Sequence, residues 1–184
     1  DALREEDVST LNAFVDGCKR ENPEGWGVKE QEIYGSPAQL LVEHPELDRH
    51  VQPPRSYPIV AAILGEGVRF AQFDFREAPP ETAGDCAMDF HRDRGNVVLN
   101  RRKESPFECA YLCAIYYLWD VHDCCPCFCV MPNSHRYQTK EEARAQMTNY
   151  QEVPIRGKAG TGILYNIDIF HARVTGVDAC THGR

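Results

Sequence analysis

Three stretches with apolar residues at helical spacing occupy the first third of the chain. Apolar residues recur every three or four positions between Val8 and Val15, which predicts an amphipathic helix that ends at Asn22-Pro23. A second stretch, SPAQLLVEHPELDRHV, opens with serine and proline, and a third, SYPIVAAILGEG, is stopped by Gly65. We therefore expect a helical lead-in over about residues 1–66.

From Val68 onward the pattern changes to short apolar stretches separated by glycine and proline turns. GVRFAQFDFREAPP alternates between two faces and predicts a strand that paired prolines terminate. ECAYLCAIYYLWDV suits a strand covered on both sides, CFCVMP is a further short strand, and GTGILYNIDIFHARV runs apolar up to His171. Helices followed by many short strands predict a mainly β protein with a helical flank (α+β), folded as a single domain whose double-sheet body covers about residues 67–184.

Length, charge and cysteine content narrow the class of protein. A chain of 184 residues suits one domain, and its net charge of −8 argues against a nucleic-acid partner, because phosphate binding needs a basic surface. No apolar run reaches the ~18 to 20 residues of a membrane span. Nine cysteines, an odd number, favour a reducing, cytoplasmic location with mostly free thiols. The chain begins with aspartate, so a processed or unseen N-terminus stays open, as does the oligomeric state.

The segment DFHRDRG contains the first candidate chemistry. On a strand, residues two apart point to the same face, so His91 and Asp93 would project side by side while Arg92 points the other way. An imidazole beside a carboxylate provides two of the three ligands of a facial metal triad, which needs one further histidine. The alternative is a strand-end histidine paired with an aspartate for structural reasons.

His171 is the candidate for the third ligand, because it ends the apolar run ILYNIDIF. The 80 residues that separate it from His91 leave room for about four strands, which can bring the two segments together in a rolled sheet. Arg184 follows 13 positions later, with Thr175 between them. A guanidinium binds a carboxylate through two parallel hydrogen bonds, so this order of residues suits a keto-acid cosubstrate that chelates iron.

Three ordered motifs, FHRDRG, VMPNSHR and GKAGTGILYNIDIFHARVTG, resemble the phytanoyl-CoA dioxygenase family of Fe(II)/2-oxoglutarate oxygenases. The resemblance covers most of residues 38–184. It implies a double-stranded β-helix, which is a cupin-like jelly-roll with helices packed on one sheet. It also implies that His91, Asp93 and His171 hold Fe(II), that Arg184 with Thr175 binds the C5 carboxylate of 2-oxoglutarate, and that ascorbate acts as a supporting reductant.

The sequence also departs from the family pattern. Arg184 lies further beyond the distal histidine than is usual, which makes Arg173 a competitor for the carboxylate, and a last strand is expected after Arg184. The resemblance implies O2 and a small-molecule metabolite or natural product as partners. Hydroxylation is the favoured outcome, because Asp93 fills the position that halogenases of this type leave open for chloride. Desaturation, epoxidation and ring formation use the same ligands and stay open.

Two other functions compete with this hypothesis. The first is a zinc-binding structural module formed by Cys124, Cys125, Cys127 and Cys129, although CCPCFC spaces its thiols more tightly than the paired motifs of structural zinc sites. The second is a non-catalytic or differently metallated jelly-roll binding protein that has the fold without the turnover.

Overall fold

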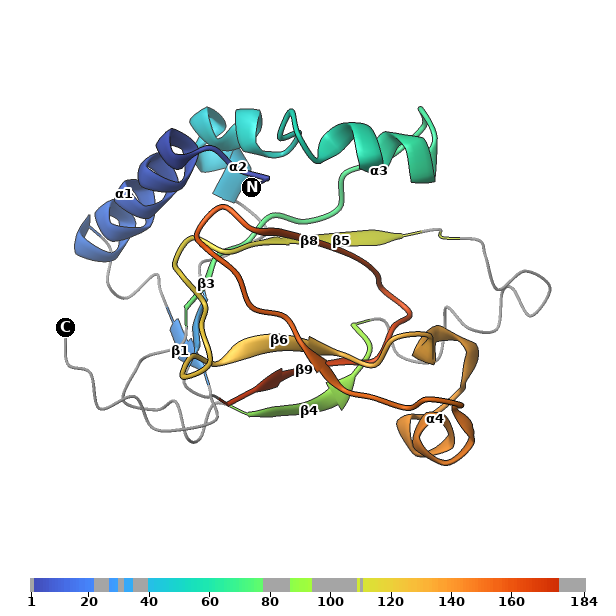
Figure 1. The fold of residues 1–184 in the computed structure, drawn as a ribbon. Coiled ribbons are helices and arrows are strands. Elements are labelled where there is room, and N and C mark those ends of the chain that lie inside the picture. The colour runs from blue at the N-terminus through green and yellow to red at the C-terminus, as the bar shows by residue number, and fades with distance from the viewer. Residues whose placement is uncertain are drawn as a thin grey trace.

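The computed structural model describes residues 2–21, 27–29, 32–34, 40–77, 87–93, 109 and 111–175 (Figure 1). The helices are α1 (Glu5–Glu21), α2 (Leu40–Glu43), α3 (Tyr57–Leu64) and α4 (Lys140–Gln146), with the 3-10 helices η2 (Pro45–His50) and η6 (Ser134–Arg136). The strands are β1 (Gly27–Lys29), β2 (Glu32–Tyr34), β3 (Arg76–Glu77), β4 (Met88–His91), β5 (Leu112–Tyr116), β6 (Cys127–Val130), β7 (Val153–Pro154), β8 (Gly162–Asn166) and β9 (His171–Val174). None of the described helices combines the length and apolar composition that a membrane crossing requires.

Two antiparallel sheets form the body of the protein. One has the strand order β4-β9-β6-β7, and the other pairs β5 with β8; a small sheet of β1, β2 and β3 is separate. In Figure 1, β5 and β8 lie between the helices α1 to α3 and the sheet that contains β4, β6 and β9. The predicted mainly β fold, with helices covering one sheet, is therefore confirmed.

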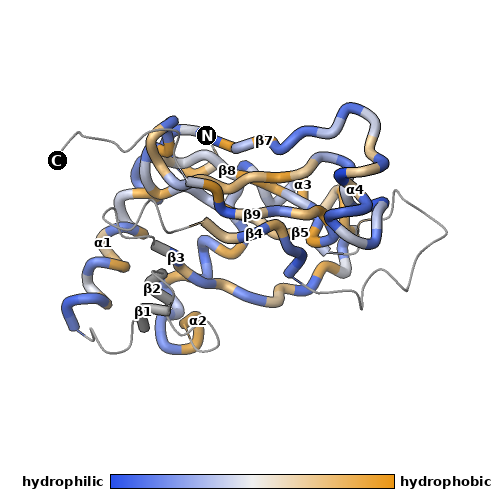
Figure 2. Tube along the Cα trace, turned by 90° about the horizontal axis from the view of Figure 1, so that it is seen from below, coloured by the Kyte–Doolittle hydropathy of each residue, from blue (hydrophilic) through white to orange (hydrophobic). Residues whose placement is uncertain are grey.

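A hydrophobic cluster covers the outer side of each sheet. The cluster between the helices and the β5–β8 sheet contains Leu3, Val8, Leu11, Leu40, Leu47 and Phe75. Apolar and polar positions alternate along α1, as Figure 2 shows, so this helix buries one face there. The cluster between the other sheet and α4 contains Phe90, Cys129, Met131, Ala143, Phe170 and Ala172. Because strand residues alternate between faces, His171 and Arg173 on β9 face away from Ala172 and the outer cluster.

Two predicted elements differ in the structure. Residues 68–75 do not form the predicted strand. Only Arg76–Glu77 of that stretch pairs, and its partner is β2. Asp74 there accepts hydrogen bonds from Gln72 and Arg76, local contacts that need no partner strand. The apolar run before His171 divides into β8 and β9. It turns because the Asn166 side chain accepts a hydrogen bond from the backbone N–H of Asp168, as asparagine does in such turns.

Arg92 joins the segments that carry the three sequence motifs. Its side chain is buried and, as predicted, points away from its two neighbours in DFHRDRG. The guanidinium donates to the backbone carbonyls of Ser134 (2.9 Å), Tyr137 (2.5 Å), Gln138 (3.1 Å) and Asp168 (2.6 Å). It also lies 3.7 Å above the centre of the Phe170 ring. Burial lowers the pKa of Arg92, and the four carbonyl dipoles and the ring stabilise its charge.

The PNSH turn packs against the residue that precedes the distal histidine. Asn133 adopts a left-handed conformation with φ 67°, which lets the chain turn sharply after Met131. The fully buried Ser134 hydroxyl then accepts a hydrogen bond of 2.7 Å from the backbone N–H of Phe170, and Met131 N–H donates to the Phe170 carbonyl at 2.9 Å. These bonds fix the start of β9 and thereby the position of His171.

We expect Arg92→Met to lower the free energy of unfolding by about 3 kcal/mol or more, because it leaves several buried carbonyls without a donor. Arg144→Met is the matched control. Arg144 lies on the surface and pairs with the partly exposed Glu152, so the same substitution there should cost less than about 1 kcal/mol. Urea unfolding followed by tryptophan fluorescence measures both values. Equal losses in the two variants would contradict the role assigned to Arg92.

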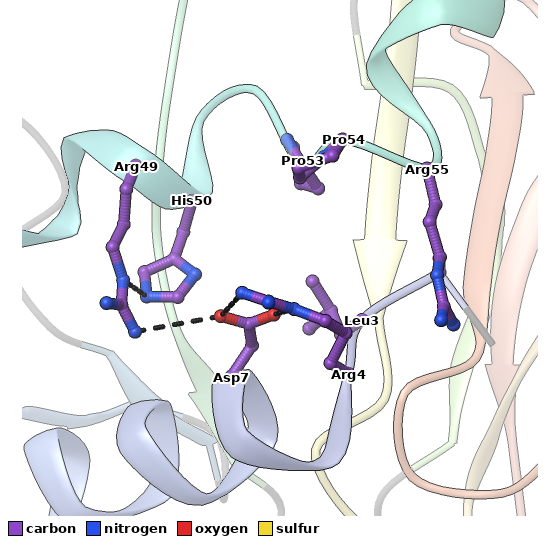
Figure 3. Close-up of a pocket in the computed structure, with 9 residues that line it drawn as sticks. Leu3, Arg4, Asp7, Arg49, His50, Pro53, Pro54 and Arg55 are labelled. Carbon is purple, nitrogen blue, oxygen red and sulfur yellow. Dashed lines mark hydrogen bonds and ion pairs between the residues drawn. The ribbon is translucent and has the colours of Figure 1, made fainter.

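A second polar network lies within the helical layer, beside a cavity of about 250 Å³ (Figure 3). Asp7 is buried and accepts a hydrogen bond of 2.9 Å from Arg4, which lowers the pKa of the Asp7 carboxyl. Arg49 lies 3.6 Å from the same carboxylate and donates to His50 Nε2 at 3.0 Å. Burial, and then the nearby Arg49 charge, lower the pKa of His50, with Arg4 acting in the same direction and Asp7 opposing. The network therefore favours a neutral His50.

This network predicts loss of stability on mild acidification. Because the pKa of His50 is lower in the folded than in the unfolded chain, the unfolded state binds more protons as the pH falls below about 6.5, and stability is lost there. We expect His50→Gln to reduce the drop in Tm between pH 7.5 and pH 5.5. His44→Gln, in the neighbouring turn, is the control and should keep the full drop. A His50→Gln variant with an unchanged drop would show that another group titrates.

Candidate metal centre

The ends of β4 and β9 bring two histidines side by side. His91 is the direct cross-strand partner of His171, and their ring centres lie 4.6 Å apart. β4 ends at His91, so Asp93 lies in the turn that follows rather than on the predicted strand. Its carboxylate nevertheless comes to the same side. Asp93 Oδ1 is 3.3 Å from His171 Nε2 and 3.8 Å from His91 Nε2, and one donor atom of each residue lies within 4.8 Å of the other two.

The backbone of each strand fixes the orientation of its histidine ring. His91 Nδ1 is 2.8 Å from the carbonyl oxygen of Asp89, and His171 Nδ1 is 3.0 Å from that of Ile169. A carbonyl oxygen can only accept, so the proton of each neutral ring lies on Nδ1 and Nε2 carries the lone pair. Both Nε2 atoms lie close to Asp93. A hydrogen bond from the second ring nitrogen is also what metal-binding histidines generally make.

The three donor atoms fit a divalent transition metal. Bonds of about 2.1 Å at right angles would place neighbouring donors about 3 Å apart, close to the 3.3 and 3.8 Å found around Asp93 Oδ1. Two imidazoles and one carboxylate form the donor set of non-haem Fe(II) oxygenases, and they leave three of six coordination positions open. Among the described residues, no other group of three or more His, Cys, Asp or Glu side chains has comparable geometry.

The charge on Asp93 suits a metal ligand. His171, whose Nε2 lies 3.3 Å from Oδ1, has the largest influence on the pKa of Asp93 and lowers it, against the opposing effect of burial. Tyr165 donates a further hydrogen bond of 3.2 Å to Oδ2. Asp93 is therefore an ionised carboxylate at neutral pH, which is the form that binds metals.

Three side chains that the sequence analysis did not identify line this centre. The Phe128 ring lies 5.3 Å from that of His171 and 4.7 Å from that of Tyr165, and the Cys113 thiol is 3.9 Å from Asp93 Oδ2. Each lies in a mostly apolar strand, whose sequence does not distinguish its two faces. Nothing in one strand alone indicates which face points to the metal centre, so these residues become identifiable only after the strands are paired.

The residues expected to bind the 2-oxoglutarate carboxylate are only partly described. Arg184 lies outside the described residues, and Thr175 is half-buried directly after β9. Arg173 is half-buried on β9, opposite Phe128 on β6, and burial lowers its pKa. Because the Phe128 ring faces the metal centre and cross-strand partners share a face, Arg173 faces the metal centre too.

The cysteine cluster does not have the structure that the zinc hypothesis needs. Cys124 is disulfide-bonded. The six other described cysteines are free, in line with the expectation of mostly free thiols. Cys127 and Cys129 are buried on β6, and burial raises the pKa of both thiols, to about 11 for Cys129, so they remain protonated.

The fold is similar to that of several solved oxygenases. The "non-heme alpha ketoglutarate dependent carbocyclase SnoK from nogalamycin biosynthesis" aligns with a TM-score of 0.69 and 20% identity, over 96% of this chain and 72% of that one. EctD from S. alaskensis "with bound Fe" has a TM-score of 0.69 and 16% identity, over 97% and 66%. The epimerase SnoN, also from nogalamycin biosynthesis, has a TM-score of 0.66 and 17% identity, over 97% and 71%. The chain thus spans about two thirds to three quarters of their lengths, and the cupin-like jelly-roll is confirmed.

No curated protein matches the chain in sequence, but a family model does. The model is that of phytanoyl-CoA dioxygenase (PhyH), and it matches residues 1–173, a range that includes His91, Asp93 and His171 and ends before Arg184. Fe(II) and 2-oxoglutarate, the expected cofactors, are those of this family. The chain therefore belongs to the phytanoyl-CoA dioxygenase family of Fe(II)/2-oxoglutarate-dependent oxygenases.

Proposed function

We propose that the protein hydroxylates a small-molecule metabolite or natural product, with release of succinate and CO2. In this proposal His91 and His171 bind Fe(II) through Nε2, and Asp93 binds it through a carboxylate oxygen. The bound iron and 2-oxoglutarate supply the oxidising chemistry, and the protein positions the substrate and excludes water.

The observation that carries the proposal is the convergence of three donor atoms whose orientation is already fixed. The Nδ1 contacts to Asp89 and Ile169 direct both lone pairs toward Asp93 Oδ1. A purely structural histidine–aspartate pair would need only one of the two histidines. Two rings held in the same way beside one carboxylate leave half of an octahedral coordination sphere for the keto acid and O2.

The type of reaction is the finer part of the proposal. The similar structures include a carbocyclase, an epimerase and EctD with 2-oxoglutarate and 5-hydroxyectoine, so one fold serves several outcomes. Asp93 favours hydroxylation over halogenation, because its carboxylate takes the position that a halide would need. The substrate itself depends on loops around the site.

The first test is a metal-binding experiment. We expect anaerobic addition of Fe(II) and 2-oxoglutarate to produce a weak visible charge-transfer band, and we expect His91→Ala and Asp93→Ala to abolish it, because each removes one of three ligands. His122→Ala is the matched control, since His122 lies on an exposed loop and contacts Cys125. A band that persists in both ligand variants would show that the ligands are assigned wrongly.

We also propose that Arg173 contributes to the binding site for the distal carboxylate of 2-oxoglutarate. It lies two residues beyond His171 on the same face of β9, which separates the two Cα atoms by roughly 6–7 Å. That spacing suits a five-carbon keto acid chelated at one end and paired with a guanidinium at the other. Arg184, which the sequence predicts as the residue that binds this carboxylate, is the alternative to Arg173.

Paired substitutions decide between the two arginines. We expect Arg173→Met to weaken binding of 2-oxoglutarate to the Fe(II) protein by about tenfold or more, because a bidentate charged pair is lost, and to leave Fe(II) affinity unchanged. Titration of the charge-transfer band measures both affinities. Arg184→Met is measured in parallel, and a loss confined to that variant would make Arg184 the anchor.

A further inference from the structure

The two oxygens of the Asp93 carboxylate have different surroundings. Oδ1 faces the two histidines, 3.3 Å from His171 Nε2 and 3.8 Å from His91 Nε2. Oδ2 accepts a hydrogen bond of 3.2 Å from the Tyr165 hydroxyl and lies 3.9 Å from the Cys113 thiol. One oxygen is thus directed to the candidate metal position, and the other is held by protein groups.

The groups that hold Oδ2 come from the opposite sheet. Tyr165 on β8 and Cys113 on β5 are direct cross-strand partners, whereas both histidines belong to β4 and β9. The Tyr165 ring packs against His171, with ring centres 5.1 Å apart, and against Phe128 at 4.7 Å. Packing therefore fixes where its hydroxyl lies. The phenolic hydroxyl is a donor at neutral pH, so it can donate to the Asp93 carboxylate at this distance.

Asp93 needs such an anchor because of its place in the chain. It lies in the turn after β4 ends at His91, so no strand pairing orients its backbone. The last torsion of an aspartate side chain is also broad, so its carboxylate can rotate with little resistance. Without a contact on Oδ2, both oxygens could turn toward a bound ion.

We propose that Tyr165 is a positioning residue that keeps Asp93 a ligand through Oδ1 alone, by holding Oδ2 away from the metal. This inference rests on the proposed function. A carboxylate that binds through both oxygens takes two coordination positions, as glutamate does in calcium sites. Together with two histidines it would leave only two of six positions, so a chelating keto acid would leave none for O2. Tyr165 thus preserves the open positions on which the chemistry depends.

The test is Tyr165→Phe, which removes the hydroxyl and retains the ring that packs on His171 and Phe128. Fe(II) affinity and 2-oxoglutarate affinity are measured separately under anaerobic conditions, the second by titration of the charge-transfer band. We expect the variant to retain Fe(II) affinity within about threefold, because a second carboxylate oxygen replaces what the anchor supplied. We expect its 2-oxoglutarate affinity to fall by about tenfold, the scale of outer-contact effects at metal centres, because the second Asp93 oxygen then competes with the keto acid for a coordination position.

Tyr116→Phe is the matched control. Tyr116 lies on β5 of the same two-stranded sheet, but its hydroxyl pairs with Ser56 in the helical layer, 2.7 Å away. Both affinities should equal those of the wild type in this variant. Circular dichroism melting confirms that each variant is folded before titration. Cys113→Ala, which also removes a group near Oδ2 and leaves the Tyr165 bond in place, should lower 2-oxoglutarate affinity less than Tyr165→Phe does.

The outcomes separate this inference from the proposed function. A wild-type protein that forms no charge-transfer band overturns the proposed function and this inference with it. If the wild type forms the band and Tyr165→Phe matches it in both affinities, the function stands and the positioning role is wrong. The positioning role is equally wrong if Tyr165→Phe loses Fe(II) affinity while its 2-oxoglutarate affinity stays unchanged, since the hydroxyl would then only strengthen the ligand.

Discussion

The hydrogen bonds of the buried Arg92 guanidinium connect the segments that carry the three candidate metal ligands. This one side chain lies between two candidate ligands in sequence, yet it reaches across the outer side of the sheet to four carbonyls. Those carbonyls belong to Ser134 in the PNSH turn, to Tyr137 and Gln138 between η6 and α4, and to the turn that precedes β9. Arg92 therefore ties the segment that carries His91 and Asp93 to the turn that leads into His171. A shorter or differently shaped side chain could not reach all four acceptors, because only the planar guanidinium offers five donors in fixed directions.

The candidate metal centre lies between two sheets, and each sheet contributes different groups to it. The sheet of β4, β6, β7 and β9 carries the histidines, and its outer face is sealed by the cluster around Phe90, Phe170 and α4. The β5–β8 sheet carries the groups that touch Asp93 Oδ2, and the helices seal its outer face through a separate cluster. The candidate site thus lies between two sheets that each have their own apolar support.

Much of this arrangement follows from sequence patterns. Helical spacing predicts α1 and α3, and the i, i+2 spacing of His91 and Asp93 correctly places them side by side, although the strand ends at His91. The two short strands Gly27–Lys29 and Glu32–Tyr34 were not predicted, because three residues are too few to show a period. The disulfide at Cys124 and the contact of Tyr165 with Asp93 were also missed. Both depend on which distant segments meet, and that information is absent from any single stretch of sequence.

Both imidazoles are hydrogen-bonded to the carbonyl two residues earlier in their own strand. The orientation of each imidazole ring is consequently set by a backbone carbonyl of its own strand, and this contact does not depend on the identity of a neighbouring side chain. Substitutions around them that preserve the β4–β9 pairing leave the two lone pairs converging, so the surrounding side chains are free to diverge toward new substrates without rebuilding the candidate iron-binding centre.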